Sequence, residues 1–140
     1  MGEHLNVTGV LETAINVGDL DTAIAFYLRL FGFEILEKDE RLCAFNVGGR
    51  SILLLFQKGS DKTPTVVPGG VIPHHEGECS THFAFSITAD DLPAWENRLT
   101  CEGVSIESKV SWPRGGRSVY FRDPDANLVE LVTPGIWAFY

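Results

Sequence analysis

The chain repeats one order of sequence patterns in its two halves. Residues 12–17 (ETAINV) align with residues 82–87 (HFAFSI), and in both segments bulky apolar residues alternate with small or polar ones. Alternation with a period of two is typical of a half-buried β-strand. A supersecondary unit that occurs twice restricts the fold to architectures assembled from two similar modules.

Each of these segments is followed by the pattern of an amphipathic helix. In the first half, apolar residues recur at helical spacing at Leu20, Ala23, Ile24, Tyr27 and Phe31. We expect Asp19 to cap this helix, and Asp90 or Asp91 to cap the helix of the second half. Gly32 and Gly103 follow the two helices, at the position where glycine commonly ends a helix.

Three short β-type segments follow each helix, so the chain reads β-α-β-β-β twice. They are FEILEK, LCAFNV and SILLLFQ in the first half, then VSIESKV, GRSVYFRD and NLVELVT in the second, with PDAN as a tight turn. We therefore predict a single α+β domain over residues 1–140, with a mostly antiparallel sheet. Module one covers about residues 10–57 and module two about residues 80–133, with a connecting loop at 58–79 and a tail at 134–140.

The alternation also predicts which face of each first strand lines a cavity. The bulky apolar residues must face the helix, so the opposite face carries small and polar residues. These are Glu12, Ala14 and Asn16 in the first module, and His82, Ala84 and Ser86 in the second. Such a surface is a poor core but a suitable wall for a polar cleft between the two half-sheets.

Composition restricts the classes of partner. The 140 residues are 44% hydrophobic and 21% charged, which is the balance of one ordinary globular domain. A net charge of −8 without a basic patch argues against nucleic-acid and membrane partners. Three cysteines without a CxxC motif, no signal-peptide pattern and no membrane-spanning run predict a cytoplasmic protein with free thiols.

Two longer stretches resemble a known family. They are VGDLDTAIAFYLRLFGFEI in the first module and GRSVYFRDPDANLVELVTPG in the second, and the second is the more specific. Both resemble the vicinal oxygen chelate superfamily of glyoxalases, bleomycin-resistance proteins and extradiol dioxygenases, over about residues 10–133. The resemblance implies paired βαβββ modules that form a U-shaped sheet around a cleft with a divalent metal ion, and a homodimer would be in keeping with it.

The resemblance also implies a set of metal ligands. Position by position, the ligand places fall on Glu12, His82 and Glu130. Most relatives have histidine at the first of these places, so Glu12 departs from the family pattern. Some relatives have a fourth ligand on the last strand of module one, where this chain has Leu53 or Leu55, with Gln57 as the only polar residue of that parity.

The chemistry of these ligands favours certain metals. One imidazole and two carboxylates favour Mn²⁺, Fe²⁺ or Mg²⁺, while Zn²⁺ and Ni²⁺ remain possible. Without a cation, two carboxylates crowded beside a partly buried cleft would repel each other. The alternative is that Glu12 and Glu130 face solvent, that His82 is only hydrogen-bonded, and that no metal binds.

These observations predict a metal-dependent, glyoxalase-like enzyme with lyase or isomerase chemistry on a small substrate that chelates the metal. Glu12 or Glu130 would then be a ligand that also acts as the general base. The alternatives are a metal-free, bleomycin-resistance-type binding protein, an extradiol dioxygenase and an antibiotic-modifying thiol transferase.

Substrate binding is predicted for the segment SWPRGGRSVYF, which supplies Trp112, Arg114, Arg117 and Tyr120. The alternative is an exposed hairpin whose arginines are solvated. His74 and His75 are not expected to be ligands, because adjacent residues point to opposite faces of a strand and this stretch is predicted to be loop. The apolar C-terminus IWAFY is expected to dock on the core or on a partner subunit of a homodimer.

Overall fold

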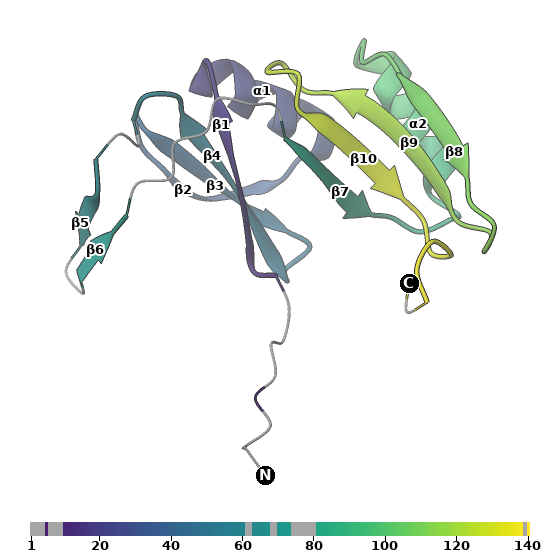
Figure 1. The fold of residues 1–140 in the computed structure, drawn as a ribbon. Coiled ribbons are helices and arrows are strands. Elements are labelled where there is room, and N and C mark those ends of the chain that lie inside the picture. The colour runs from purple at the N-terminus through teal and green to yellow at the C-terminus, as the bar shows by residue number, and fades with distance from the viewer. Residues whose placement is uncertain (1–4, 6–9, 61–62, 68–69, 74–80, 139) are drawn as a thin grey trace. The chain divides into compact units, whose positions relative to one another are not determined.

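The computed structural model describes residues 5, 10–60, 63–67, 70–73, 81–138 and 140 (Figure 1). The βαβββ order that the sequence predicts is present twice, and this confirms the α+β class. The described elements are β1 (Glu12–Val17), α1 (Leu20–Phe31), β2 (Glu34–Lys38), β3 (Leu42–Val47), β4 (Ser51–Gln57), β5 (Thr65–Val67), β6 (Gly70–Ile72), β7 (His82–Ser86), α2 (Leu92–Cys101), β8 (Ser108–Ser111), β9 (Arg117–Arg122) and β10 (Leu128–Val132).

Backbone contacts divide the chain into two units. The first unit comprises residues 1–20 and 33–76, and the second comprises residues 21–32 and 77–140. All of α1 except Leu20 therefore belongs to the second unit, although the helix precedes β2 in the sequence.

The first unit contains a four-stranded sheet in the order β1-β4-β3-β2. Strands β1 and β4 are parallel, and the other neighbours are antiparallel. Burial alternates along β1 as predicted, because Ile15 and Val17 are buried whereas Glu12 and Ala14 are exposed. Leu11, which directly precedes this strand, is 60% exposed.

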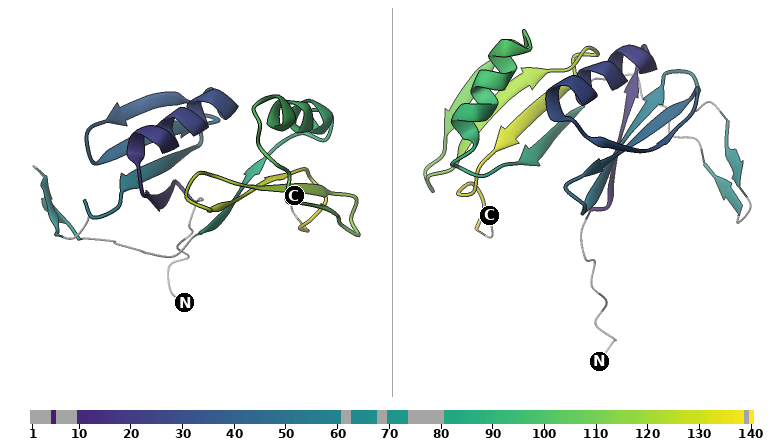
Figure 2. Two further views of the ribbon diagram at one scale, coloured as in Figure 1. Left: turned by 90° about the horizontal axis from the view of Figure 1, so that it is seen from above. Right: turned by 180° about the vertical axis from the view of Figure 1, so that it is seen from behind.

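The second unit repeats this topology in a sheet of order β7-β10-β9-β8. Strands β7 and β10 are parallel, and β9 pairs antiparallel with both β10 and β8. Helix α2 lies across one face of this sheet (Figure 2). The two sheets have equivalent strand orders and directions, so the internal repeat of the sequence is a repeat of structure.

Helix α1 contributes to the core of the second unit. The ring centroid of Phe31 lies 5.0 Å from that of Phe85 and 5.5 Å from that of Trp95, within the range of favourable aromatic pairs. The hydroxyl of buried Tyr27 donates a hydrogen bond of 2.9 Å to Asp123, which lies in the turn between β9 and β10. Burial of this polar pair carries little penalty, because each group satisfies the other.

Both helices end at the predicted glycines, the cap at Asp19 stays a prediction, and the predicted side-chain cap of α2 is not formed. Gly32 and Gly103 have φ of +64° and +71°, the left-handed conformation that glycine adopts at low cost after a helix. Asp91 occupies the N-cap position of α2, but its side chain makes no capping hydrogen bond. Asp91 has φ of −84° and ψ of −10°, in the helical region, whereas a residue that caps with its side chain is typically extended; Pro93 in the first turn also has no N–H group to donate.

The structure also differs from the prediction in two other segments. Strands β5 and β6 form an antiparallel hairpin within residues 58–79, which we predicted as a loop. The β-branched residues on both sides of a Pro-Gly dipeptide are the signal that favours this hairpin. Strand β8 begins only at Ser108, so the first residues of VSIESKV are not in the sheet. Neither described helix is long and apolar enough to cross a membrane.

Candidate pocket on the second sheet

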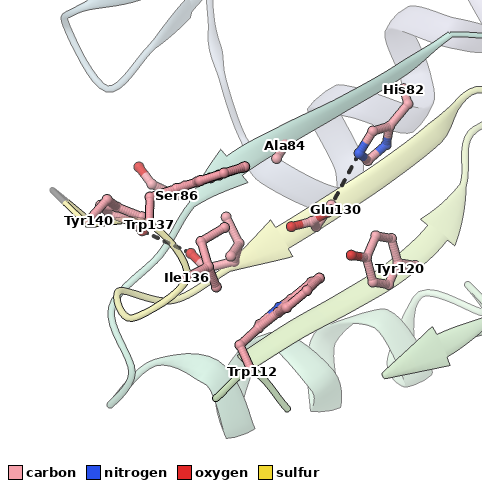
Figure 3. Close-up of a pocket in the computed structure, with 10 residues that line it drawn as sticks. His82, Ala84, Ser86, Trp112, Tyr120, Glu130, Ile136, Trp137 and Tyr140 are labelled. Atoms are coloured by element: carbon pink, nitrogen blue, oxygen red, sulfur yellow. Dashed lines mark hydrogen bonds and ion pairs between the residues drawn. The ribbon is translucent and has the colours of Figure 1, made fainter. Parts of the chain in front are cut away.

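A pocket with a volume of about 750 Å³ opens on the second unit (Figure 3). This volume lies within the range of about 300–1,000 Å³ that is usual for small-molecule sites. The described residues that line it are His82, Ala84, Ser86, Trp112, Tyr120, Glu130, Val132, Ile136, Trp137 and Tyr140.

The alternating faces of the strands explain this lining. On β7, His82, Ala84 and Ser86 point into the pocket, as the sequence predicts for this face. On β10, Glu130 lies beside Ala84 and points the same way, whereas Val129 is fully buried in the core. The pocket therefore lies on the sheet face that carries the small and polar residues.

His82 and Glu130 face each other in the pocket. The Nε2 atom of His82 lies 3.5 Å from Oε1 of Glu130. The Nδ1 atom of His82 lies 3.0 Å from the carbonyl oxygen of Leu128. A carbonyl oxygen only accepts hydrogen bonds, so this contact requires the proton on Nδ1 and leaves Nε2 directed toward Glu130. This is the arrangement in which histidine commonly ligates metals, with the other ring nitrogen bound to the backbone.

The carboxylate of Glu130 is buried and held by hydrogen bonds. Its side chain is only 8% exposed. The Ser118 hydroxyl donates to Oε2 at 3.0 Å, and the indole N–H of Trp112 donates to that hydroxyl oxygen at 2.8 Å. This chain of donors fixes Oε2, so Oε1 is the oxygen that faces His82.

Tyr120 adds a hydroxyl beside this pair. Burial raises the pKa of the Tyr120 phenol, and the neighbouring carboxylate of Glu130 raises it further. The phenol is therefore protonated at neutral pH and is able to donate a hydrogen bond to a ligand.

A buried hydrogen-bond network supports the start of β7. Asn127 Oδ1 accepts hydrogen bonds from the backbone N–H and the hydroxyl of Thr81, at 2.9 and 3.1 Å. Asn127 Nδ2 in turn donates to Asp123, the residue that also accepts from Tyr27. Because Thr81 precedes His82, this network helps to position the imidazole.

The pair fits part of a metal site. An imidazole nitrogen and a carboxylate oxygen are suitable ligands for a divalent transition metal. Nε2 of His82 and Oε1 of Glu130 lie 3.5 Å apart, close enough for both atoms to ligate one cation. No third His, Cys, Asp or Glu joins them among the described residues of this unit. Glu12, the remaining predicted ligand, begins β1 in the first unit and is exposed.

The other predicted positions have different roles. Gln57 is engaged by the backbone, since it accepts from the N–H of Leu20 at 2.8 Å and donates to the carbonyl of Gly18 at 2.7 Å. It thus caps the start of α1, while Leu53 and Leu55 are buried in the core. His74 and His75 lie outside the described residues.

Two of the four predicted substrate residues line the pocket. Trp112 and Tyr120 do so, whereas Arg114 and Arg117 are exposed and are not among its described lining residues. A substrate role for these two arginines stays a prediction. The lining residues that the sequence analysis did not assign to the cleft are Val132, Ile136, Trp137 and Tyr140. The only sequence signal for the last three is an apolar C-terminus that needs a surface to dock on.

Comparison with known proteins agrees with this architecture. Residues 9–131 match the family model of the glyoxalase/bleomycin resistance protein/dioxygenase superfamily. The metallothiol transferase FosB of Bacillus licheniformis is 34% identical over 137 residues, which cover 96% of this chain and 81% of that protein. A probable lactoylglutathione lyase of Vibrio cholerae is 26% identical over 88% of both chains.

A solved structure shares the fold closely. The lactoylglutathione lyase from Agrobacterium tumefaciens superposes with a TM-score of 0.85 and 33% identity, covering 95% of this chain and 98% of that one. The family match spans both βαβββ modules and includes His82, Glu130 and Glu12. This chain therefore belongs to the glyoxalase/bleomycin resistance protein/dioxygenase superfamily.

Proposed function

We propose that this protein is a metal-dependent enzyme of the glyoxalase kind, with lyase or isomerase chemistry on a small substrate. The substrate would chelate a divalent metal ion through neighbouring oxygen atoms. The observation that carries the proposal is the His82–Glu130 pair, in which Nε2 and Oε1 lie 3.5 Å apart in the pocket. The other ring nitrogen of His82 and the other oxygen of Glu130 are each hydrogen-bonded to the protein. Ligand orientation of this kind is typical of metal sites.

The metal would be held by His82, Glu130 and Glu12. Two carboxylates and one imidazole favour Mn²⁺, Fe²⁺ or Mg²⁺. When bound, the ion supplies Lewis acidity that stabilises a developing negative charge on a substrate oxygen. Homodimerisation stays a prediction of the resemblance.

The chain's own groups have separate roles in this proposal. The Leu128 carbonyl holds the imidazole so that Nε2 faces the pocket, and Ser118 holds one oxygen of Glu130. Tyr120, as a protonated phenol, would donate a hydrogen bond to a substrate oxygen. Both oxygens of Glu130 are directed toward protein groups, so we assign proton abstraction to Glu12.

The test is formation of lactoylglutathione, the compound in the name of one relative, from methylglyoxal and glutathione, with and without Mn²⁺. We expect activity that requires the metal, and Glu130→Gln should lower kcat about 100-fold or more, because it removes a charged ligand. Glu107→Gln is the matched control, since Glu107 is exposed and pairs with Arg122 at 2.9 Å. Absence of both metal binding and turnover would favour a metal-free binding protein of the bleomycin-resistance kind.

A second candidate is thiol transfer, which the 34% identity to the metallothiol transferase favours. The same metal pair would then activate an electrophile for attack by a small thiol. The assay is loss of free thiol in the presence of Mn²⁺ and an epoxide antibiotic such as fosfomycin. Thiol loss without lactoylglutathione formation would select this activity over the first.

A further inference from the structure

We infer that the ligand of this pocket carries a flat apolar group, such as an aromatic ring, at the end opposite its chelating oxygens. The chelating end of this inference rests on the proposed function, whereas the apolar end rests on the pocket alone. The C-terminal residues Ile136, Trp137 and Tyr140 form the surface that this group would contact.

The pocket is chemically asymmetric along the strands. In the parallel register, Leu128 pairs with His82, Glu130 with Ala84 and Val132 with Ser86. Figure 3 shows His82 and Tyr120 toward one end of the pocket and the C-terminal residues at the other, with Glu130 between them. At about 3.3 Å per residue, the four steps from His82 to Ser86 span about 13 Å. This length accommodates a chelating group and a ring in one ligand.

The C-terminal wall is held in place by hydrogen bonds. The Tyr140 hydroxyl donates to the carbonyl oxygen of Val132 at 2.9 Å. The backbone N–H groups of Ile136 and Trp137 donate to the carbonyl of Tyr140 at 3.1 and 3.0 Å, which closes a tight turn. The backbone of this segment and the Tyr140 ring are thus positioned before a ligand arrives, and this lowers the entropic cost of binding.

Two glycines let this segment approach the β8–β9 hairpin closely. The N–H of Gly116 donates to the carbonyl of Gly135 at 3.0 Å. A Cβ atom on Gly116 would lie only 2.6 Å from the carbonyl carbon of Gly135. Gly135 itself has φ of +108°, which side chains disfavour. Both positions need glycine for the C-terminal wall to reach the pocket.

Trp137 is the side chain most available to a ligand. It lines the pocket, yet 63% of its surface is exposed. Such an exposed indole, in a pocket that Trp112 and Tyr140 also line, offers a face on which a planar apolar group stacks favourably. Large exposed aromatic side chains at a pocket commonly mark ligand-binding surface.

The experiment compares two chelators that share one metal-binding group. Acetohydroxamate and benzohydroxamate both bind metals through two neighbouring oxygens, but only the second carries a ring. We expect calorimetry with the Mn²⁺-loaded protein to show benzohydroxamate binding about tenfold more tightly or better. Trp137→Ala should remove about tenfold of benzohydroxamate affinity and leave acetohydroxamate affinity unchanged, while Trp137→Phe should retain most of the preference.

Leu36→Ala is the matched control, because Leu36 is apolar and 50% exposed but lies on β2 of the first unit. It should leave both affinities unchanged. Equal affinities of the wild type for the two hydroxamates would overturn the inference, and so would an equal loss of both affinities in Trp137→Ala. Either result would leave the proposed metal site unaffected.

A metal-independent probe separates the inference from the proposed function. 2-Naphthol presents a flat apolar ring system without two neighbouring oxygens. If neither hydroxamate binds but 2-naphthol binds and requires Trp137, the metal proposal is wrong and the apolar site is supported. If 2-naphthol also fails to bind the wild type, the inference is overturned together with the metal proposal.

Discussion

Ser118 is the residue that sets the orientation of Glu130. Its buried hydroxyl stands between the Trp112 indole, 2.8 Å away, and the Glu130 carboxylate, 3.0 Å away. Ser118 is therefore a positioning residue, acting on the proposed metal ligand rather than on the substrate.

We predict that Ser118→Ala lowers Mn²⁺ affinity about 10- to 100-fold, as loss of the groups that orient metal ligands commonly does. It should also cost about 1–3 kcal/mol of unfolding free energy, since buried polar partners lose a hydrogen bond. Calorimetric Mn²⁺ titration and urea denaturation measure the two effects. Ser108→Ala on the same sheet, at an exposed position, is the control. Unchanged Mn²⁺ affinity in Ser118→Ala would show that Glu130 is oriented by other means.

Tyr27 is the buried titratable residue that couples stability to pH. Burial raises the pKa of its phenol strongly. The Asp123 carboxylate, which accepts a hydrogen bond from the phenol, raises this pKa further. A pKa that is raised in the folded state means that the unfolded chain loses the proton first. The stabilisation is complete below the unfolded pKa of about 10 and is lost as pH rises above it.

We therefore expect the unfolding free energy to fall as pH rises from about 9.5 to about 11.5. Tyr27→Phe should reduce this pH dependence and cost about 1–3 kcal/mol at neutral pH, because Asp123 loses a buried donor. Urea denaturation of both proteins across this range is the measurement. The same slope in wild type and Tyr27→Phe would assign the alkaline loss of stability to other groups.

At the scale of elements, the C-terminal segment and the β8–β9 hairpin act together as one wall of the pocket. Trp112 comes from the hairpin, Ile136 and Trp137 come from the segment, and all three line the pocket. The close approach of Gly116 and Gly135 holds the two pieces together. A substitution that separates the backbones should thus affect the apolar end of the pocket before it affects the His82–Glu130 end.

Gly116→Ala tests this coupling. The added methyl group would lie within 3 Å of the Gly135 backbone and the Ile136 side chain, so the C-terminal segment must move away. We predict a stability loss of about 1–3 kcal/mol from this overpacking and a weaker preference for an aromatic ligand. Thermal unfolding and the hydroxamate comparison measure both. Ser111→Ala in the same hairpin is the control, and an unaltered ligand preference in Gly116→Ala would contradict the coupling.

At the scale of the whole molecule, metal binding at the proposed site would be linked to folding stability. His82 and Glu130 belong to the second unit and Glu12 to the first. A ligand that binds only the folded state stabilises it by mass action, by about 2.7 kcal/mol at a concentration 100 times Kd. Metal-dependent stability is thus a direct measure of metal binding, and substitution of each proposed ligand tests its contribution.

We predict that Mn²⁺ raises the melting temperature of the wild type and that His82→Ala removes most of this rise. If Glu12 is a ligand, Glu12→Gln should also reduce this rise in melting temperature. Glu12 lies 118 positions before Glu130 in the sequence. Glu34→Gln, exposed on β2, is the control. A melting temperature that no divalent ion changes would contradict the metal proposal, and a normal response of Glu12→Gln would remove Glu12 from the site.

The sequence by itself determined the two-module fold and the pocket-facing side of β7. Hydrophobic periodicity indicates which face of a helix or strand is buried. The repetition of the same order of patterns in both halves indicates two similar modules. It therefore placed His82, Ala84 and Glu130 correctly on strands, as it did Gly32 and Gly103 at helix ends.

Only the tertiary structure decided which residues far apart in the sequence contact one another. The register of β9 and β10 brings Ser118 to Glu130, and Gln57 caps a helix that begins 37 positions earlier. The tight turn at the C-terminus carries Trp137 to the far end of the pocket. The hydrophobic pattern of the sequence does not predict such contacts. They depend on which distant segments the fold brings together, and not on the order of neighbouring residues.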